Sequence, residues 1–342
     1  MAYTTIKKPS DYFNTKLYTG NGSTNNITGV GFQPDWVWLK DRDSTEWHNL
    51  FDVVRGITAN RLYTNSTTVT DGYDSNALQS FDSDGFTLGS GGAYNNSGNN
   101  FVSWNWLAGT TSGLSGGTIT PSSYSINATS GFGIYKYTGN STSGATIAHG
   151  LGKVPTMIMV KRLDSPKEWQ IYHTAMGNGK WIELTTGTPQ TGISRWNNTS
   201  PTNTLFYLGN DSDVNNSAGT YLAYVFCDVT GYSKFGSYTG NGNTDGTFVY
   251  TGFKPAFVMT KETSDTSSWG MWDNKRLGYN PDQKRIQAED SAAESSTGSL
   301  DLLSNGFKLT SASGSLNTSG NTFIYMAFAE EPLVGDNPAT AR

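Results

Sequence analysis

The feature that most constrains this chain is a short apolar stretch that occurs three times. The first copy, Gly31–Lys40, holds a proline followed by Trp36-Val37-Trp38-Leu39 and a closing lysine. In each copy the proline lies six residues before the lysine: Pro34 and Lys40, Pro155 and Lys161, Pro255 and Lys261. Bulky and aromatic residues favour strands, and proline is confined to strand starts and edges. The spacing therefore predicts three copies of one strand-centred unit.

Each copy is followed by a strand-rich segment of nearly constant length. The lysine is separated from the last aromatic residue of its unit by 66, 65 and 67 positions: 40 to 106, 161 to 226 and 261 to 328. Asp84-Gly85 marks a tight hairpin turn, and Phe101–Trp106 alternates so that one face is expected to be core. A short helix is the expectation only for residues 283–296.

These observations predict an all-β fold of three tandem antiparallel β-sandwich (jelly-roll-like) repeats. The expected segments are an N-terminal arm (1–13), repeat 1 (14–107), a Gly/Ser/Thr linker (108–130), repeat 2 (131–227), a short linker (228–233), repeat 3 (234–329) and a polar C-terminal tail (330–342). With 342 residues, the chain is long enough to bury a sizeable core.

Composition excludes several classes of protein. The formal net charge is −5 and no basic stripe is present, which argues against nucleic-acid binding. Aromatic residues make up 13% of the chain, unlike a disordered protein. No run has the length of a signal peptide or a membrane span, so we expect a protein made in a cytoplasm, without membrane insertion. Cys227 alone cannot form an internal disulfide, and we expect it near the end of a buried strand.

Candidate catalytic and metal-binding groups do not recur between the copies. Asp35, Asp41, Asp43 and Glu46 could supply a glycosidase pair, but Asp35 corresponds to Thr156 and Ala256. Asp82-Ser83-Asp84-Gly85 lacks the spacing of an EF-hand and is better explained as a turn.

The histidines show no catalytic or metal-binding spacing either. His48, His149 and His173 are interpreted as hydrogen-bonded residues at sheet edges, with His48 and His173 in comparable places. We predict no enzyme activity, no catalytic residue, no metal site and no cofactor.

Two groups of residues are candidates for contacts with partners. Aromatic side chains in loops could stack on sugar rings or touch a receptor: Tyr73, Tyr94, Trp196 and Tyr279. The arm lies outside the repeats and could order on a partner, with candidate attachment residues Tyr3, Ile6, Lys7, Lys8 and Pro9.

Several motifs carry a resemblance to a known group of proteins. They are Met1-Ala2-Tyr3-Thr4-Thr5-Ile6, Tyr18-Thr19-Gly20-Asn21-Gly22, Gly31-Phe32-Gln33-Pro34-Asp35-Trp36, Phe81-Asp82-Ser83-Asp84-Gly85-Phe86, Ala148-His149-Gly150-Leu151-Gly152, Gly231–Gly240 and Pro338-Ala339-Thr340-Ala341-Arg342. With these motifs the chain resembles three-repeat β-rich virion proteins of tailed bacteriophages, especially marine ones, often labelled tail-fibre-like.

The resemblance implies a non-enzymatic structural protein on the virion surface, made in the host cytoplasm. Its expected partners are other virion proteins of the tail or capsid and a host surface glycan or protein. Two positions stay open: a tail or fibre component that contacts the host, and a capsid decoration protein or head knob with pseudo-threefold symmetry. A carbohydrate-binding lectin or a glycan hydrolase is a further alternative.

Overall fold

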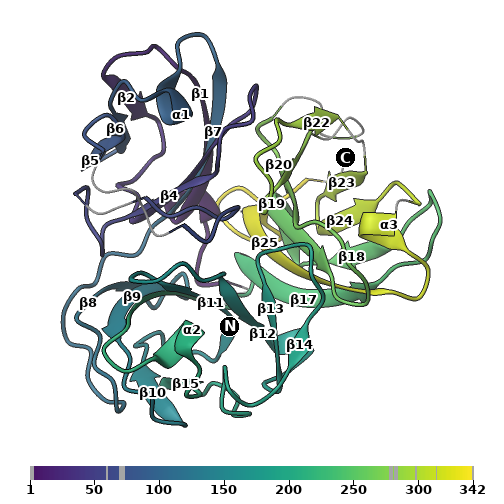
Figure 1. Cartoon of the computed structure of the whole chain (residues 1–342). Helices are drawn as coiled ribbons and strands as arrows, with labels where there is room; N and C mark the ends of the chain where they lie inside the picture. Colours follow the sequence, from purple (N-terminus) through teal and green to yellow (C-terminus); the bar gives the residue numbers. More distant parts are fainter. Residues whose placement is uncertain are drawn as a thin grey trace.

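The computed structural model describes residues 4–58, 61–68, 74–276, 280, 284–296, 299–312 and 314–340. The fold over these residues is all-β, as the sequence predicted, with antiparallel sheets and only one-turn helices. Figure 1 shows three lobes around a common centre, which we call lobe 1 (β1–β7), lobe 2 (β8–β16) and lobe 3 (β17–β25).

Lobe 1 follows a short 3-10 helix, η1 (Pro9–Asp11). Its sheets have the strand orders β1-β7-β3-β4 and β2-β6-β5. The elements are β1 (Phe13–Thr19), β2 (Asn25–Thr28), β3 (Trp36–Asp41), β4 (Asn49–Asp52), β5 (Leu78–Asp82), β6 (Gly85–Leu88), α1 (Gly92–Asn95) and β7 (Asn100–Trp106).

Lobe 2 has a seven-stranded sheet, β14-β13-β12-β11-β16-β9-β8, and a two-stranded sheet, β10-β15. Its elements are β8 (Ser123–Asn127), β9 (Phe132–Thr138), β10 (Ala145–Ala148), β11 (Pro155–Arg162), β12 (Gln170–His173), η2 (Thr174–Met176), β13 (Lys180–Glu183), β14 (Gln190–Thr191), β15 (Leu205–Leu208), α2 (Ser212–Asn215) and β16 (Thr220–Cys227).

Lobe 3 has the strand orders β17-β25-β19-β20-β21-β22 and β18-β24-β23. Its elements are β17 (Ser233–Thr239), β18 (Phe248–Tyr250), β19 (Phe253–Glu262), β20 (Gly270–Asp273), β21 (Lys284–Gln287), β22 (Ser295–Ser296), β23 (Leu300–Leu303), β24 (Gly306–Leu309), α3 (Gly314–Asn317) and β25 (Thr322–Pro332).

One strand order recurs in the larger sheet of every lobe: β1-β7-β3-β4, β9-β16-β11-β12 and β17-β25-β19-β20. The register recurs as well, because the central residue of each proline-to-lysine strand faces an equivalent partner. These pairs are Trp38 with Trp104, Met159 with Tyr224, and Met259 with Met326. Positions can therefore be compared between lobes by counting from Lys40, Lys161 and Lys261.

The proline-to-lysine strands are buried on both faces. In β3, Val37 and Leu39 point into a core that belongs to lobe 1, whereas Trp36 and Trp38 point into a second core. This central core also holds the residues at the equivalent strand positions of the other lobes, which are Met157 and Met159 of β11 and Phe257 and Met259 of β19. Each large sheet thus covers its own lobe on one face and joins the shared core on the other.

Aromatic stacking ties the lobes together inside the central core. Trp36 lies between Trp106 of its own lobe and Tyr224 of lobe 2, with ring centroids at 4.2 and 4.3 Å. Phe13 of lobe 1 stacks on Phe328 of lobe 3 at 5.0 Å. Since such rings bury large apolar areas, the three lobes share one folding core.

A buried asparagine fastens the first turn of every lobe. Asn215, the last residue of α2, accepts a hydrogen bond from the Asn140 backbone N–H at 2.8 Å and donates to the Thr142 and Gly209 carbonyls. The same bond to a loop backbone N–H joins Asn95 to Asn21 and Asn317 to Asn241, each at 2.9 Å. Each asparagine starts an Asn-x-Ser sequence, a recurring signal that the strand-based reading overlooked.

The structure corrects four expectations about local structure. The predicted linker at 108–130 contains β8, which extends the lobe 2 sheet, and the predicted tail begins inside β25. The helix expected within 283–296 is wrong, because β21 and β22 occupy that segment. β7 is buried on both faces, since Ser103 and Asn105 are as inaccessible as its tryptophans.

Candidate functional site

The loop aromatics predicted to make surface contacts are not on the surface where the structure describes them. Tyr94 and Trp196 are each 1% exposed. The Tyr94 hydroxyl donates to Asp74 at 2.8 Å, and the Trp196 ring packs edge-on against Tyr172. The prediction is wrong for these two residues, because Tyr94 in α1 packs into the core of lobe 1 and Trp196 packs into the core of lobe 2. Tyr73 and Tyr279 lie outside the described residues.

The N-terminal arm is part of the fold. Ile6 is 1% exposed and belongs to the central core, and Pro9 is buried at the start of η1. The Lys7 carbonyl accepts a hydrogen bond from the Asp336 N–H at 3.2 Å. The expectation of an arm outside the lobes without a core is therefore wrong. Of the predicted attachment residues, Lys7 and Lys8 are exposed, and Tyr3 lies outside the described residues.

The histidines are interior residues rather than edge residues, and His48 and His173 are not equivalent. His48 lies eight residues after Lys40, the position that Trp169 and Trp269 occupy after Lys161 and Lys261. His173 pairs with Met157 in lobe 2, just as Asp52 pairs with Trp36 in lobe 1. His173 is therefore equivalent to Asp52 and not to His48. The sequence comparison missed this because Trp47 and His48 mimic the order of Trp169 and His173.

The residues eight positions after the closing lysines, His48, Trp169 and Trp269, form a ring of hydrogen bonds between the lobes. At each junction a ring N–H meets a backbone carbonyl of the adjacent lobe. The pairs are Trp169 with Tyr63 at 2.8 Å, Trp269 with Glu183 at 3.2 Å, and His48 with Gln287 at 3.0 Å. Trp38 donates to His48 Nδ1 at 2.8 Å, so His48 carries its proton on Nε2. Burial lowers the pKa of His48 well below its usual value, which keeps the ring neutral.

The residues at the second position, Asp52, His173 and Asp273, also form hydrogen bonds between the lobes. Two of them, Asp52 and Asp273, are buried carboxylates. Asp52 accepts a hydrogen bond from the Tyr224 hydroxyl of lobe 2 at 3.1 Å, and it pairs with Arg55 at 2.5 Å. Asp273 accepts from the Trp104 indole of lobe 1 at 3.1 Å and pairs with Arg276 at 2.7 Å. Both acids therefore link two lobes while their charge is matched by an arginine three residues later.

The third junction uses different residues that compensate for one another. Met326 of lobe 3 occupies the position of Tyr224 and Trp104 and has no hydrogen to donate. His173 replaces the acid and donates from Nε2 to the Tyr325 carbonyl at 3.2 Å. Met176 replaces the arginine, because a neutral histidine needs no counter-ion.

The closing lysines of lobes 2 and 3 also donate hydrogen bonds across these junctions. Lys161 donates to the Thr67 carbonyl of lobe 1 and Lys261 to the Thr186 carbonyl of lobe 2, both at 3.1 Å. Lys40 donates within its own lobe, to the carbonyls of Asp41 and Ser44. Burial lowers the pKa of each of the three ammonium groups to about 8.

Asp35 and Asp84, two of the candidate acids, have structural partners. Asp35 accepts hydrogen bonds from the Ala108 N–H at 2.8 Å and the Ser125 hydroxyl at 3.0 Å, which attaches β8 to lobe 1. Burial raises the pKa of Asp35. Asp84 accepts from the backbone N–H groups of Gly29 and Gly31, and these bonds lower its pKa. Within the described residues, no group of three His, Cys, Asp or Glu side chains could hold a metal ion.

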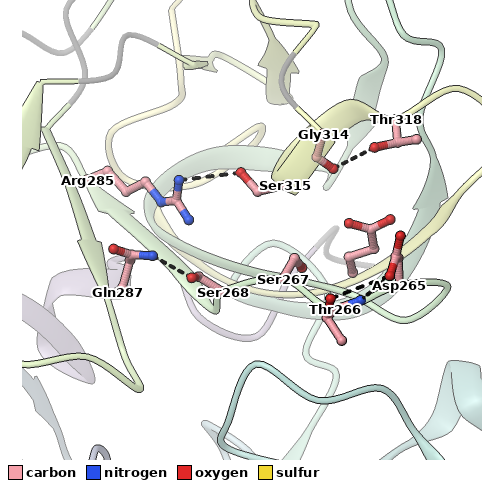
Figure 2. Close-up of a pocket in the computed structure, with 10 residues that line it drawn as sticks. Asp265, Thr266, Ser267, Ser268, Arg285, Gln287, Gly314, Ser315 and Thr318 are labelled. Carbon is pink, nitrogen blue, oxygen red and sulfur yellow. Dashed lines mark hydrogen bonds between the residues drawn. The ribbon is translucent and has the colours of Figure 1, made fainter.

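A polar pocket opens in lobe 3. It has a volume of 440 Å³ and is bounded by the loop after β19, by β21 and by α3. Figure 2 shows Arg285 and Gln287 on one side of the opening and Asp265 and Thr266 on the other. The lining residues are Glu262, Asp265, Thr266, Ser267, Ser268, Arg285, Gln287, Gly314, Ser315 and Thr318.

The pocket presents both charged and neutral hydrogen-bonding side chains. Arg285 donates to the Ser315 hydroxyl at 3.4 Å, and its Nε has no hydrogen-bond partner among the described residues. Burial lowers the pKa of this guanidinium. Glu262, which is 2% exposed, accepts a hydrogen bond from the Asn321 amide. This lining is suited to a hydroxylated ligand rather than an apolar one, because a buried polar atom such as Arg285 Nε is stabilised by a hydrogen-bond partner.

The fold and the site define the class of the molecule, which is an all-β protein of three lobes around a shared core, with a polar pocket in lobe 3. Residues 8–332 match the family model described as Domain of unknown function (DUF7483), and the chain belongs to this family. Neither the curated proteins nor the solved structures contain a match to the chain. No helix in the described part is long and apolar enough to cross a membrane.

Proposed function

We propose that the chain is a non-enzymatic structural protein on the surface of a tailed-bacteriophage virion, associated with the tail or its fibres and able to contact the host surface. In this proposal the three lobes are tandem β-sandwich repeats of one unit. The recurring strand order, the common register and the recurring asparagine support that relation. The motifs that resemble phage virion proteins support the location.

The observation that carries the proposal is the shared central core. Trp36 and Tyr224 stack across lobes at 4.3 Å, and buried hydrogen bonds cross all three junctions. Such packing makes a single solid body from three small units, while their loops remain at the periphery. Recognition by loops on a well-packed β scaffold is a common arrangement in binding proteins.

The use of reactive side chains supports a structural role over catalysis. The three histidines, Cys227 and the paired acids Asp52 and Asp273 are all buried. Burial raises the pKa of Cys227 to about 12, which removes its nucleophilic form at neutral pH. These groups contribute to packing and to lobe junctions.

Purified virions test the proposal directly. Mass spectrometry of particles from the phage that encodes this chain is expected to detect it at a fixed ratio to the tail proteins. Antibody labelling in electron micrographs is expected at the tail, and added purified protein is expected to slow phage adsorption to host cells. Absence of the chain from washed particles would refute the virion assignment.

A capsid decoration protein is the second candidate, and the arrangement of the junctions favours it specifically. Asn65, Thr185 and Glu289 occupy one register position in the three lobes, and all three line one cavity of 210 Å³. Their convergence indicates a pseudo-threefold axis through that cavity, suited to a threefold position of a capsid. Labelling on the head instead of the tail would select this candidate.

A further inference from the structure

The pocket of lobe 3 is a saccharide-binding site, we infer, and its ligand class is a neutral hexopyranose at the end of a surface glycan. The inference deepens the proposed function and depends on it for its biological setting. It stands physically on a comparison of lobe 3 with lobe 2, where the same place is filled.

Lobes 2 and 3 differ at two equivalent positions that border this pocket. Lys167 and Ser267 each follow the closing lysine of their strand by six residues, and both carbonyls accept a hydrogen bond from that lysine. Asp213 and Ser315 are each the second residue of the helix, in α2 and α3. Lobe 2 therefore has a lysine and an aspartate where lobe 3 has two serines.

In lobe 2 these residues close the gap. The Lys167 ammonium and the Asp213 carboxylate meet at 3.1 Å, and Arg195 adds a second bond to Asp213 at 2.8 Å. The Arg195 guanidinium also lies over the Trp181 ring, 4.8 Å from its centroid. In lobe 3 the hydroxyls of Ser267 and Ser315 are too short to meet, and the 440 Å³ pocket lies between their segments.

The lining selects the ligand. The Glu262 and Asp265 carboxylates accept hydrogen bonds, Arg285 and Gln287 donate them, and the serine and threonine hydroxyls do both. A sugar ring offers adjacent hydroxyls that match this mixture. Two carboxylates against one guanidinium disfavour a phosphate or an acidic sugar, because like charges repel in a partly desolvated site. The volume falls in the range of small-ligand pockets and accommodates one or two sugar rings.

Saturation-transfer NMR on the full chain tests the assignment. The probes are the methyl glycosides of glucose, galactose, mannose and N-acetylglucosamine, with methyl glucuronoside as the acidic comparison. We expect at least one neutral probe to receive saturation and the glucuronoside to receive less. The double variant Ser267→Lys with Ser315→Asp rebuilds the lobe 2 ion pair in lobe 3, and it is expected to weaken binding at least tenfold.

A matched control makes the opposite change in lobe 2. Lys167→Ser with Asp213→Ser removes the ion pair there and is expected to leave the affinity of the lobe 3 site within twofold. Circular dichroism reports whether each variant folds. If the lobe 3 double variant fails to fold, Asp265→Asn replaces it, because this side chain is exposed and accepts hydrogen bonds from its neighbour Thr266, and the variant is expected to weaken binding at least fivefold.

The results separate the pocket from the virion assignment. Absence of saturation on all neutral probes, stronger binding of the glucuronoside, or unchanged affinity in the folded lobe 3 variant would overturn the saccharide site. None of these outcomes affects detection of the chain in virions. Sugar binding by a chain that is absent from virions would keep the site and refute the proposed function.

Discussion

Replacing Trp38 with alanine is expected to destabilise the whole molecule, because this side chain belongs to the core that all three lobes share. Trp38 is fully buried, packs edge-on against Trp104, and donates a hydrogen bond to His48 Nδ1 at 2.8 Å. His48 in turn bonds to the Gln287 carbonyl of lobe 3. The substitution therefore opens a cavity and also weakens a junction between lobes.

The expected cost has two parts. Truncating a buried tryptophan to alanine costs about 3–5 kcal/mol through lost burial and the remaining cavity. Leaving the buried Nδ1 of His48 without a donor adds about 1 kcal/mol or more. A total near 5 kcal/mol is comparable with the whole stability of many proteins, roughly 5–15 kcal/mol. Trp38→Phe keeps most of the volume and loses the hydrogen bond to His48, so we expect the free energy of unfolding to fall by about 2 kcal/mol.

Urea unfolding followed by circular dichroism and by tryptophan fluorescence measures both variants. Because the three lobes share one core, the two signals of the wild type are expected to change in a single coincident transition. An alanine variant within about 0.5 kcal/mol of wild type would refute the assignment of Trp38 to the shared core. Separate transitions for separate lobes would refute the idea that the core unites them.

Three further predictions follow from the same contacts. Asn215→Ala is expected to lower the free energy of unfolding by about 3 kcal/mol, because a buried side chain loses three hydrogen bonds, whereas Asn216→Ala is expected to cost less than about 1 kcal/mol. Burial lowers the pKa of His173 to about 4, so stability that is present above pH 6.5 is expected to fall as the pH drops from 6.5 towards 4, by at most roughly 3 kcal/mol for this residue, and a flat urea midpoint across this window would contradict the buried neutral ring. Deleting residues 1–12 removes the buried Ile6 and is expected to lower the melting temperature, with a loss of about 2 kcal/mol; an unchanged melting temperature would show that Ile6 adds nothing to the core.

Local sequence was sufficient for the class of fold and for the main strands. Strand preference, proline placement and Gly turns are properties of neighbouring residues, so the proline-to-lysine strands and the Asp84-Gly85 hairpin were predictable. The burial of Trp38 and Cys227 was predictable for the same reason, since a continuous apolar run has no face to present to water.

The candidate site was not predictable from local pattern. Tyr94 and Trp196 lie in loops by composition, but contacts with distant segments bury them. The lobe 3 pocket brings together residues from the loop after β19, from β21 and from α3, more than fifty positions apart at the extremes. In our interpretation the pocket is open because Ser267 and Ser315 stand where lobe 2 has the Lys167–Asp213 ion pair. This difference is recognised only when the two lobes are compared in the structure.

The sequence by itself determined that the chain is all-β and that one strand unit occurs three times, because side-chain alternation and turn chemistry are local. Only the tertiary structure decided what covers the second face of each large sheet. That face meets the other lobes, and its contacts join residues far apart in the sequence, such as Asp52 with Tyr224, 172 positions apart, and Trp104 with Asp273, 169 positions apart. Those long-range contacts place His48 and His173 at interior junctions between lobes and join the N-terminal arm to the core.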